Sequence, residues 1–210
     1  MQTFATITCY AQQLSLMRNE YALFSPVEFS MRSRECLHVV GPNGCGKTSL
    51  LRAIAGIWLQ TDIALKWEGI EEPTQHCHYV GHQLGLTPRL TVYEELYFFS
   101  LLHADFDSRK ILAAIKQLGL ESLRQMQIET LSAGQQRRVA LAKLLVVRKP
   151  IWILDEPFSA LDHQGVGCLQ QLLTEHSQAN GILFLSSHQS LSLNNIPIIK
   201  LSLSAQEVAT

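Results

Sequence analysis

The stretch Gly41-Pro42-Asn43-Gly44-Cys45-Gly46-Lys47-Thr48 fits the pattern G-x-x-x-x-G-K-[ST] at every fixed position. Glycines let the backbone wrap tightly enough for consecutive N–H groups to point at phosphate oxygens, and a helix that starts near Gly46 adds its positive end. Lys47 would neutralise the β and γ phosphates, and Thr48 would offer its hydroxyl to Mg²⁺. The apolar run Cys36–Val40 precedes the stretch, and a helical pattern follows it. The sequence therefore predicts a phosphate-binding loop between a strand and a helix.

A second apolar run, Ile151–Leu154, ends in two carboxylates, Asp155 and Glu156. Taken alone, two acids after a strand serve equally well as a helix cap. In a chain with a phosphate-binding loop, we expect Asp155 to hold Mg²⁺ through water and Glu156 to orient or deprotonate the attacking water. If the sheet is parallel, we expect this strand to neighbour the strand before the loop. The two carboxylates therefore predict a metal-binding residue, Asp155, and a catalytic base, Glu156, in one site.

Strand signals alternate with helical signals along much of the chain. Short apolar runs of the kind buried on both faces of a sheet occur at Cys36–Val40, His78–Val80, Ile151–Leu154, Ile182–Leu185 and Ile196–Leu203. Helical spacing joins Leu50 to Trp58, although Gly56 weakens the place of Trp58, and it joins Ile111 to Leu118. This alternation predicts a mostly parallel α/β sheet. Residues 84–149 contain no convincing strand, which indicates a helical insertion.

The composition limits the possible classes of protein. Apolar residues make up 47% and charged residues 17% of the 210 residues, which excludes a disordered chain. A formal net charge of −1 argues against bulk attraction to nucleic acid or to an anionic membrane. Five cysteines without Cys-x-x-Cys spacing indicate reduced thiols. The sequence has no signal-peptide pattern and no apolar run near the ~20 residues of a membrane span, so we expect no direct membrane insertion.

The segment Leu131-Ser132-Ala133-Gly134-Gln135 opens a second helical pattern, with Ser132 as its expected N-cap. A serine hydroxyl, a glycine N–H and a helix N-terminus together make a second anion site. The segment resembles the signature motif of ATP-binding-cassette (ABC) ATPases, usually L-S-G-G-Q, with Ala133 in place of one glycine. In that family this site meets the γ-phosphate of a nucleotide held by the opposite subunit.

Three further segments lie where the ABC family places its motifs. Gln83 resembles the Q-loop glutamine, a contact to Mg²⁺ and water that also senses the transmembrane partner. Ser159-Ala160-Leu161-Asp162 resembles the D-loop, which runs along the subunit interface. His188 resembles the switch histidine that contacts the γ-phosphate. The resemblance covers about residues 22–189.

The fold class implied by this resemblance is an α/β P-loop NTPase, an ABC-type nucleotide-binding domain. It would have a RecA-like core with a small antiparallel β part at about residues 1–83 and 150–210. An inserted helical signature subdomain would occupy about residues 84–149. The partners implied are transmembrane permease subunits of an ABC transporter and a second copy of the ATPase in an ATP-sandwich dimer, with no nucleic acid.

ATP and Mg²⁺ are the implied cofactors. The resemblance implies catalytic roles for Glu156, His188 and Gln83. It implies metal contacts from Thr48, Gln83 and Asp155. The residues expected to contact the nucleotide are Gly41, Pro42, Asn43, Gly44, Cys45, Gly46, Lys47, Thr48, Ser49, Ser132, Gly134, Gln135 and Asp162.

Three segments, Leu131–Leu144, Tyr79–Leu96 and Leu23–Ser25, more closely resemble the ATPase subunits of cytochrome c maturation haem exporters. That resemblance implies a peripheral subunit on the cytoplasmic face of the bacterial inner membrane, which couples ATP hydrolysis to release of a haem-loaded chaperone. The alternatives are an ABC exporter subunit for another cargo and a nucleotide-gated clamp without a transporter. Clamp proteins usually carry two cassettes or a long coiled-coil insert. A P-loop kinase or GTPase lacks support, because the sequence contains no Asn-Lys-x-Asp motif of the kind that recognises guanine.

Two features have alternative interpretations from the residues alone. The family usually stacks adenine on an aromatic residue some two dozen positions before the phosphate loop. Tyr21 lies a few positions late for this, so the alternatives are Met17 and Arg18. An aromatic and aliphatic cluster is either core or a groove for a membrane partner's helix: Tyr93, Leu96, Tyr97 and Phe98.

Two cysteine-containing segments invite further chemistry. Cys45 is either a small packing residue or, beside a helix N-terminus, an oxidisable thiol. His76 and His78 would share one face of a strand while Cys77 faces away. Two histidines alone make a poor site, so we expect neither metal nor haem there.

Overall fold

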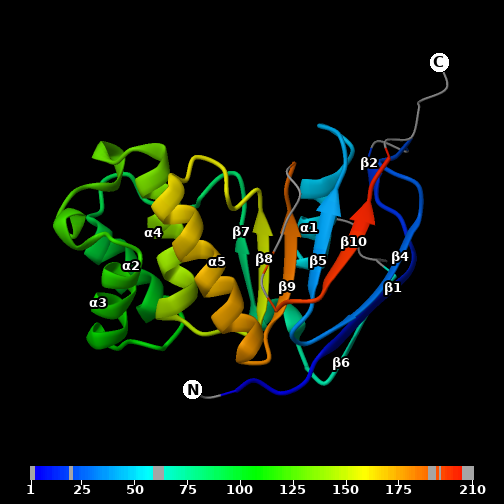
Figure 1. The fold of residues 1–210 in the computed structure, drawn as a ribbon, viewed down its shortest axis with the longest axis horizontal. Coiled ribbons are helices and arrows are strands. Elements are labelled where there is room, and N and C mark those ends of the chain that lie inside the picture. Colours follow the sequence, from blue (N-terminus) through cyan, green and yellow to red (C-terminus); the bar gives the residue numbers. More distant parts are fainter. Residues whose placement is uncertain (1–2, 19–20, 59–63, 189–192, 194, 205–210) are drawn as a thin grey trace. The chain divides into compact units, whose positions relative to one another are not determined.

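The computed structural model describes residues 3–18, 21–58, 64–188, 193 and 195–204 (Figure 1). These described residues form two compact units, one within residues 1–81, 150–157 and 173–210 and the other within residues 82–149 and 158–172. The limits of about 84–149 that the sequence analysis gives for the helical signature subdomain remain a prediction. Within the described residues, no helix combines the length and the apolar character that a membrane crossing requires.

The first unit contains a five-stranded sheet whose strands all run parallel (Figure 1). In spatial order the strands are β10 (Ile198–Ser202), β5 (Cys36–Val40), β9 (Ile182–Ser186), β8 (Ile151–Asp155) and β7 (Cys77–Val80). Each strand falls on one of the apolar runs, so the predicted parallel sheet is confirmed. The expectation that the strand carrying Asp155 neighbours the strand before the phosphate loop is wrong, because β9 lies between β5 and β8.

A smaller antiparallel sheet completes the first unit, in the order β4 (Val27–Arg32), β1 (Thr8–Leu14) and β6 (Leu65–Glu68). Burial alternates strictly along β4, because one face of this sheet packs on the core. A short hairpin of β2 (Met17–Arg18) and β3 (Tyr21–Ala22) follows β1. The sheet confirms the antiparallel part implied by the family resemblance.

Helix α1 (Lys47–Ile54) follows β5 and packs against β8 and β9. One apolar core joins α1 to both sheets, and its large, fully buried members include Leu14, Phe24, Leu37, Leu50, Leu51 and Phe184. The predicted helical spacing as far as Trp58 is wrong at its end, because the backbone leaves helical geometry at Gly56, where φ is 72°. Trp58 instead packs half-buried against the core.

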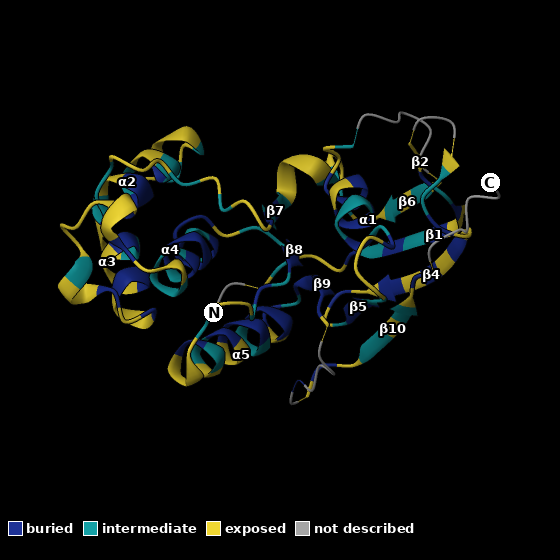
Figure 2. Cartoon of the chain, turned by 90° about the horizontal axis from the view of Figure 1, so that it is seen from above, coloured by how far each residue is buried: buried dark blue, intermediate teal, exposed yellow. Residues whose placement is uncertain are grey.

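The second unit is helical. It contains α2 (Val92–Leu102), α3 (Ser108–Gln117), α4 (Ala133–Val146) and the first part of α5 (His163–Gln178), with 3₁₀ turns at Glu121–Leu123 and Ile128–Thr130. The structure describes every residue of 84–149, and none of them lies in a strand, as the sequence predicts. Figure 2 shows α4 buried along much of its length, while α2 and α3 each keep an exposed face.

The cluster around α2 divides between core and surface. Leu96 is fully buried, Tyr93 and Tyr97 are half-buried, and Phe98 is 46% exposed. The core interpretation therefore holds for Leu96, whereas Phe98 belongs to the surface of the second unit.

Candidate nucleotide site

The phosphate-binding loop connects the carboxyl end of β5 to the first turn of α1. Gly46 is the N-cap of α1 with φ 99° and makes no side-chain capping hydrogen bond. A Cβ atom at this position would lie 2.7 Å from the Phe24 ring, so the loop requires glycine here. The first N–H groups of α1 are thus left without a side-chain cap, at the positive end of the helix.

Lys47 is the first residue of α1, and its side chain turns back over the loop. Its Nζ donates hydrogen bonds to the Gly41 carbonyl at 2.9 Å and to the Pro42 carbonyl at 3.1 Å. The residue is only 7% exposed. The ammonium group is therefore held by neutral carbonyls, at a position where it can meet a phosphate that binds the loop.

Asp155 is held by hydroxyl groups from two other elements. Thr48 donates its hydroxyl to Asp155 Oδ2 at 2.7 Å, and Ser186 donates its hydroxyl to Asp155 Oδ1 at 2.5 Å. Asp155 is 2% exposed, so these bonds offset the cost of burying its carboxylate. The loop and the end of β8 thus meet directly, although β9 separates β5 from β8.

Glu156 adopts a left-handed backbone conformation, with φ 49°. Its N–H donates to the Ser186 hydroxyl at 3.0 Å, and its carboxylate lies 3.3 Å from His188 Nε2. A non-glycine residue in this region costs free energy and persists where its surroundings fix it. Ser186 therefore positions both acids, a role that the sequence motifs do not predict. The available signal was a hydroxyl residue at the end of the buried run beside β8.

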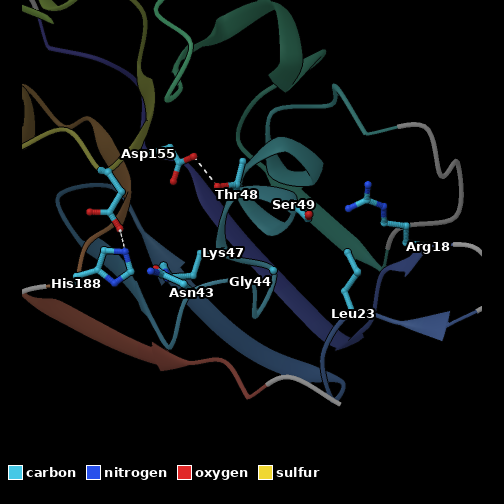
Figure 3. A pocket seen from close by; sticks show the side chains of 11 residues that line it. Arg18, Leu23, Asn43, Gly44, Lys47, Thr48, Ser49, Asp155 and His188 are labelled. Atoms are coloured by element: carbon cyan, nitrogen blue, oxygen red, sulfur yellow. Dashed lines mark hydrogen bonds and ion pairs between the residues drawn. The ribbon is translucent and has the colours of Figure 1, made fainter. Parts of the chain in front are cut away.

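A cavity of about 260 Å³ in the first unit collects these groups. Figure 3 shows Lys47, Asp155 and His188 toward one end and Arg18 with Leu23 toward the other. Its lining residues are Arg18, Leu23, Asn43, Gly44, Gly46, Lys47, Thr48, Ser49, Asp155, Glu156 and His188. Nine of the residues predicted from the motifs are thus gathered at one cavity.

Cys45 does not line this cavity. Its side chain is fully buried in the apolar core, and its Sγ would lie 2.6 Å from a Cβ atom placed on Gly41. The structure favours the packing interpretation of this cysteine, because an oxidant reaches a buried thiol only if the loop opens.

The donor set around Thr48 and Asp155 fits Mg²⁺. This ion prefers oxygen ligands and usually takes one or two protein groups together with phosphate oxygens and water. A threonine hydroxyl and a carboxylate oxygen 2.7 Å apart at the end of the phosphate loop match that preference.

The signature segment lies in the second unit, where Ser132 caps α4. The Gln135 N–H donates to the Ser132 hydroxyl at 3.3 Å, and the Ser132 N–H donates to the Gln135 side chain at 2.9 Å, which completes a capping box. The predicted N-cap is therefore confirmed. A Cβ atom on Gly134 would lie 2.5 Å from the Ala160 carbonyl oxygen, so the two segments touch through glycine.

Asp162 connects α4 to the start of α5. It accepts two hydrogen bonds from Arg138, both at 2.6 Å, and one from the Gly165 N–H at 2.8 Å. The hydrogen bond from Gly165, with a further contribution from the Arg138 charge, lowers the pKa of Asp162. These hydrogen bonds order the turn at the start of α5.

Gln83 belongs to the second unit as well and is exposed. The segment that follows it is tied to two helices by a partly buried ion pair. Lys143 of α4 lies 2.7 Å from Glu95 of α2 and donates to the Gly85 carbonyl at 3.0 Å, while Glu95 accepts from the Thr87 N–H at 3.1 Å. Residues 85–87 are thus fixed to the helix that Ser132 begins.

The pair His76 and His78 does not share a strand face. His76 ends the 3₁₀ turn Pro73–His76 and is exposed, whereas His78 is buried in β7. The predicted alternation is wrong there because the strand begins only at Cys77. Across the described residues, no three His, Cys, Asp or Glu side chains gather as a metal site would require.

Comparison with known proteins places the chain in a family. A model described as "ABC transporter" matches residues 24–159. The cytochrome c biogenesis ATP-binding export protein CcmA of Escherichia coli (strain K12) is 38% identical over 205 residues, 95% of this chain and 98% of that protein. CcmA of Vibrio vulnificus (strain CMCP6) is 38% identical over 197 residues, 90% of this chain and 96% of that protein.

The fold is similar to that of a solved ATP-binding subunit of an ABC transporter. The TM-score is 0.81 at 20% identity, covering 94% of this chain and 88% of that chain. This likeness confirms the predicted ABC-type P-loop NTPase fold. With the family match and the curated relatives, it confirms the resemblance drawn from the motifs: this chain belongs to the ABC transporter family, as one of its ATPase subunits.

Proposed function

We propose that this chain is the ATP-hydrolysing subunit of the haem exporter of cytochrome c maturation, where it couples hydrolysis to release of a haem-loaded chaperone. The observation that carries the proposal is the cavity in which Lys47, Thr48, Asp155, Glu156 and His188 meet. The export role rests on the similarity to the CcmA proteins. The chain would act at the cytoplasmic face of the bacterial inner membrane, bound to transmembrane permease subunits.

Binding would begin at the phosphate-binding loop. Backbone N–H groups of the loop and the N-terminus of α1 would receive the phosphates, and Lys47 would exchange its two carbonyl partners for the β and γ phosphates. Thr48 and Asp155 would hold Mg²⁺, which supplies neutralisation of the phosphate charge. The remaining nucleotide contacts of the first unit are assigned to Gly41, Pro42, Asn43, Gly44, Cys45, Gly46 and Ser49.

Hydrolysis would use Glu156 and His188. The Glu156 carboxylate orients the attacking water and accepts its proton as the oxygen bonds to the γ-phosphorus and the bond to ADP breaks. Ser186 keeps Glu156 in its left-handed conformation, so that the carboxylate lies beside His188. His188 would contact the γ-phosphate, and Gln83 would contact Mg²⁺ and the water.

The second half of each site would come from another copy of the chain. Ser132, Gly134, Gln135 and Asp162 of one protomer would face the nucleotide that the other protomer holds. Closure of the dimer would complete the catalytic site, so hydrolysis would be linked to opening and closing of the pair. Residues 83–87 would transmit this motion to the permease.

Replacement of Glu156 tests the assignment of the base. We expect Glu156→Gln to bind ATP with Mg²⁺ at wild-type affinity and to lose about a thousandfold in turnover, because a general base contributes 10²–10⁴-fold. Light scattering should show a stable dimer with ATP. Glu28→Gln, an exposed acid on β4, is the matched control. Near-normal turnover of Glu156→Gln would overturn the role given to this residue.

Copurification tests the export role. Tagged chain extracted from its own membranes with mild detergent should bring down small polytopic membrane proteins, and ATP should change the yield of the haem chaperone complex. Recovery of a permease without haem proteins would indicate an exporter for another cargo. Recovery with ribosomes or DNA instead would indicate a nucleotide-gated clamp.

A further inference from the structure

A phenol, that of Tyr79, lies on the strand next to the one that ends in Asp155. Tyr79 belongs to β7 and pairs with Ile153 of β8, and the two strands run parallel. Because side chains alternate between the two faces of a strand, Tyr79, Ile153 and Asp155 share one face of the sheet. Thr48 of α1 bonds Asp155 on this face. The phenol therefore lies on the face of the sheet that carries the phosphate-binding loop and its helix.

The ring of Tyr79 occupies the space that a side chain at position 81 would take. A Cβ atom placed on Gly81 would lie 2.7 Å from Tyr79 Cε1 and 2.9 Å from the Tyr79 hydroxyl oxygen. Continuing the register of β7 and β8 by one residue brings Gly81 beside Asp155. Ser186 lies on the opposite side of Asp155, since β9 and β7 flank β8. The phenol thus points along its own strand toward the free side of the Asp155 carboxylate.

The Tyr79 hydroxyl is a buried donor. Its oxygen is closed to solvent, and no hydrogen bond of ordinary geometry reaches it within the described residues. Burial raises the pKa of Tyr79, Arg52 of α1 acts in the opposite direction, and the negative charge of Asp155 raises the pKa. Since a phenol ordinarily loses its proton near about pH 10, this hydroxyl keeps its proton at neutral pH. A buried donor of this kind usually has an acceptor, and the carboxylate is the acceptor on its side of the sheet.

Asp155 has room for a further donor. It accepts from Thr48 at Oδ2 and from Ser186 at Oδ1, whereas a carboxylate offers about four lone-pair sites. Thr48 belongs to α1 and Ser186 to β9, so these two donors come from two sides of the carboxylate. Tyr79 of β7 approaches from the third side. A carboxylate that holds a metal is usually fixed by such hydrogen-bond partners, which tune the affinity for the metal.

We propose that Tyr79 is a positioning residue of the magnesium site, whose hydroxyl supports the Asp155 carboxylate when metal and nucleotide are bound. This inference rests on the proposed function, since it requires Mg²⁺ at Thr48 and Asp155. Tyr79 does not line the nucleotide cavity. It therefore strengthens the dependence of nucleotide binding on Mg²⁺ and adds nothing to nucleotide binding without the metal.

The test compares nucleotide affinity with and without the metal. Calorimetry with the non-hydrolysable ATP analogue adenylyl imidodiphosphate, in Mg²⁺ and in EDTA, gives a ratio of two affinities that needs no turnover. Tyr79→Phe removes the hydroxyl and keeps the ring, so we expect an affinity in EDTA within about twofold of wild type and a ratio about tenfold smaller. Tyr10→Phe is the matched control. The Tyr10 hydroxyl donates to Glu68 at 3.4 Å in the antiparallel sheet, and its loss should leave the ratio unchanged.

A second variant displaces the phenol without removing it. A methyl group at position 81 would lie against the Tyr79 ring, so Gly81→Ala should push the ring away from Asp155 and lower the ratio as well. Adding Gly81→Ala to Tyr79→Phe should cause little further loss, because the hydroxyl is already absent. A wild-type ratio in Tyr79→Phe would overturn the proposal. A lower melting temperature with that unchanged ratio would assign the phenol to packing alone.

Asp155→Asn separates this inference from the proposed function. If Asp155→Asn keeps the wild-type ratio, the metal is not held at Asp155, and both the metal assignment and the role of Tyr79 fail. If Asp155→Asn loses the effect of Mg²⁺ while Tyr79→Phe keeps it, the metal site stands and the role of Tyr79 alone is wrong. A loss in both variants, smaller in Tyr79→Phe, supports both proposals.

Discussion

The N-termini of α1 and α4 both carry glycine, a hydroxyl group and positive backbone charge, yet their N-cap residues differ. At α1 the cap is Gly46, which has no side chain to receive an N–H group. At α4 the cap is Ser132, whose hydroxyl accepts a hydrogen bond from the Gln135 N–H. The Gln135 side chain in turn accepts a hydrogen bond from the Ser132 N–H. The first terminus has no side chain that accepts from its N–H groups, whereas at the second a side chain accepts from the Gln135 N–H.

This difference suggests a division of labour. A terminus whose donors lack side-chain partners binds an anion without first breaking internal bonds, so α1 should bind triphosphate in a single chain. A terminus closed by a capping box stabilises its helix at the cost of ligand affinity, since a phosphate must compete with Gln135. The α4 terminus should therefore contribute only when a second protomer brings a phosphate to it.

Of the effects that separate the two termini, we expect the largest at the open terminus. Lys47→Ala removes the one buried ammonium at the loop, and loss of a charged hydrogen bond to phosphate should weaken ATP binding about a hundredfold. Affinity for ATP in a single chain, measured by calorimetry at low protein concentration, checks this. Lys66→Ala, an exposed lysine on β6, is the control and should bind as wild type. An unchanged affinity of Lys47→Ala would remove the basis for calling α1 the open end.

A smaller effect is expected at the closed terminus, where two substitutions separate capping from phosphate contact. Aspartate caps a helix as well as serine does, so Ser132→Asp should keep the thermal stability and single-chain ATP affinity of wild type. Its charge would repel a phosphate, so turnover should fall about tenfold or more. Ser132→Ala should instead lose about 1 kcal/mol of stability.

Thr91→Ser is the control, since Thr91 caps α2 with a capping box of its own, closed by Glu94, and serine keeps the hydroxyl. It should leave both stability and turnover unchanged. If Ser132→Asp hydrolyses ATP at the wild-type rate, the α4 terminus takes no part at the phosphate, and the comparison of the two termini loses its functional meaning.

The sequence predicts both termini because each is encoded locally. Gly46 and Lys47 follow an apolar run, and Ser132 stands three residues before Gln135, so short spacing fixes the turn and the cap. The five parallel strands are equally visible as apolar runs. Strand β4 is not among the predicted strands, although its buried and exposed residues alternate with the period of two that is typical of a half-buried strand.

What the sequence does not predict depends on neighbours in space. The place of β9 between β5 and β8 follows from packing, and so does the link from Ser186 to Asp155 and Glu156. The choice of Arg18 over Met17 at the cavity depends on which face of a short hairpin turns inward, and two residues of strand carry no periodic signal.

The smallest expected effect is a dependence of stability on pH, centred on the strand that precedes the open terminus. His38 of β5 is 3% exposed and lies beside Lys200 of β10. Burial lowers the pKa of His38, the charge of Lys200 lowers it further, and a hydrogen bond with the Ser187 backbone acts in the opposite direction. Because the unfolded state binds the proton more tightly, this contribution is fully present above about pH 6.5 and is lost as pH falls below it.

The melting temperature of wild type should therefore fall between about pH 7.5 and about pH 5.5, and His38→Gln should show a smaller fall over the same range. His76→Gln removes an exposed histidine and should keep the wild-type dependence. Equal falls in wild type and His38→Gln would place the acid sensitivity elsewhere in the chain. A smaller fall in His38→Gln would mean that protonation of His38 weakens the strand that carries the phosphate-binding loop, since β5 ends one residue before Gly41.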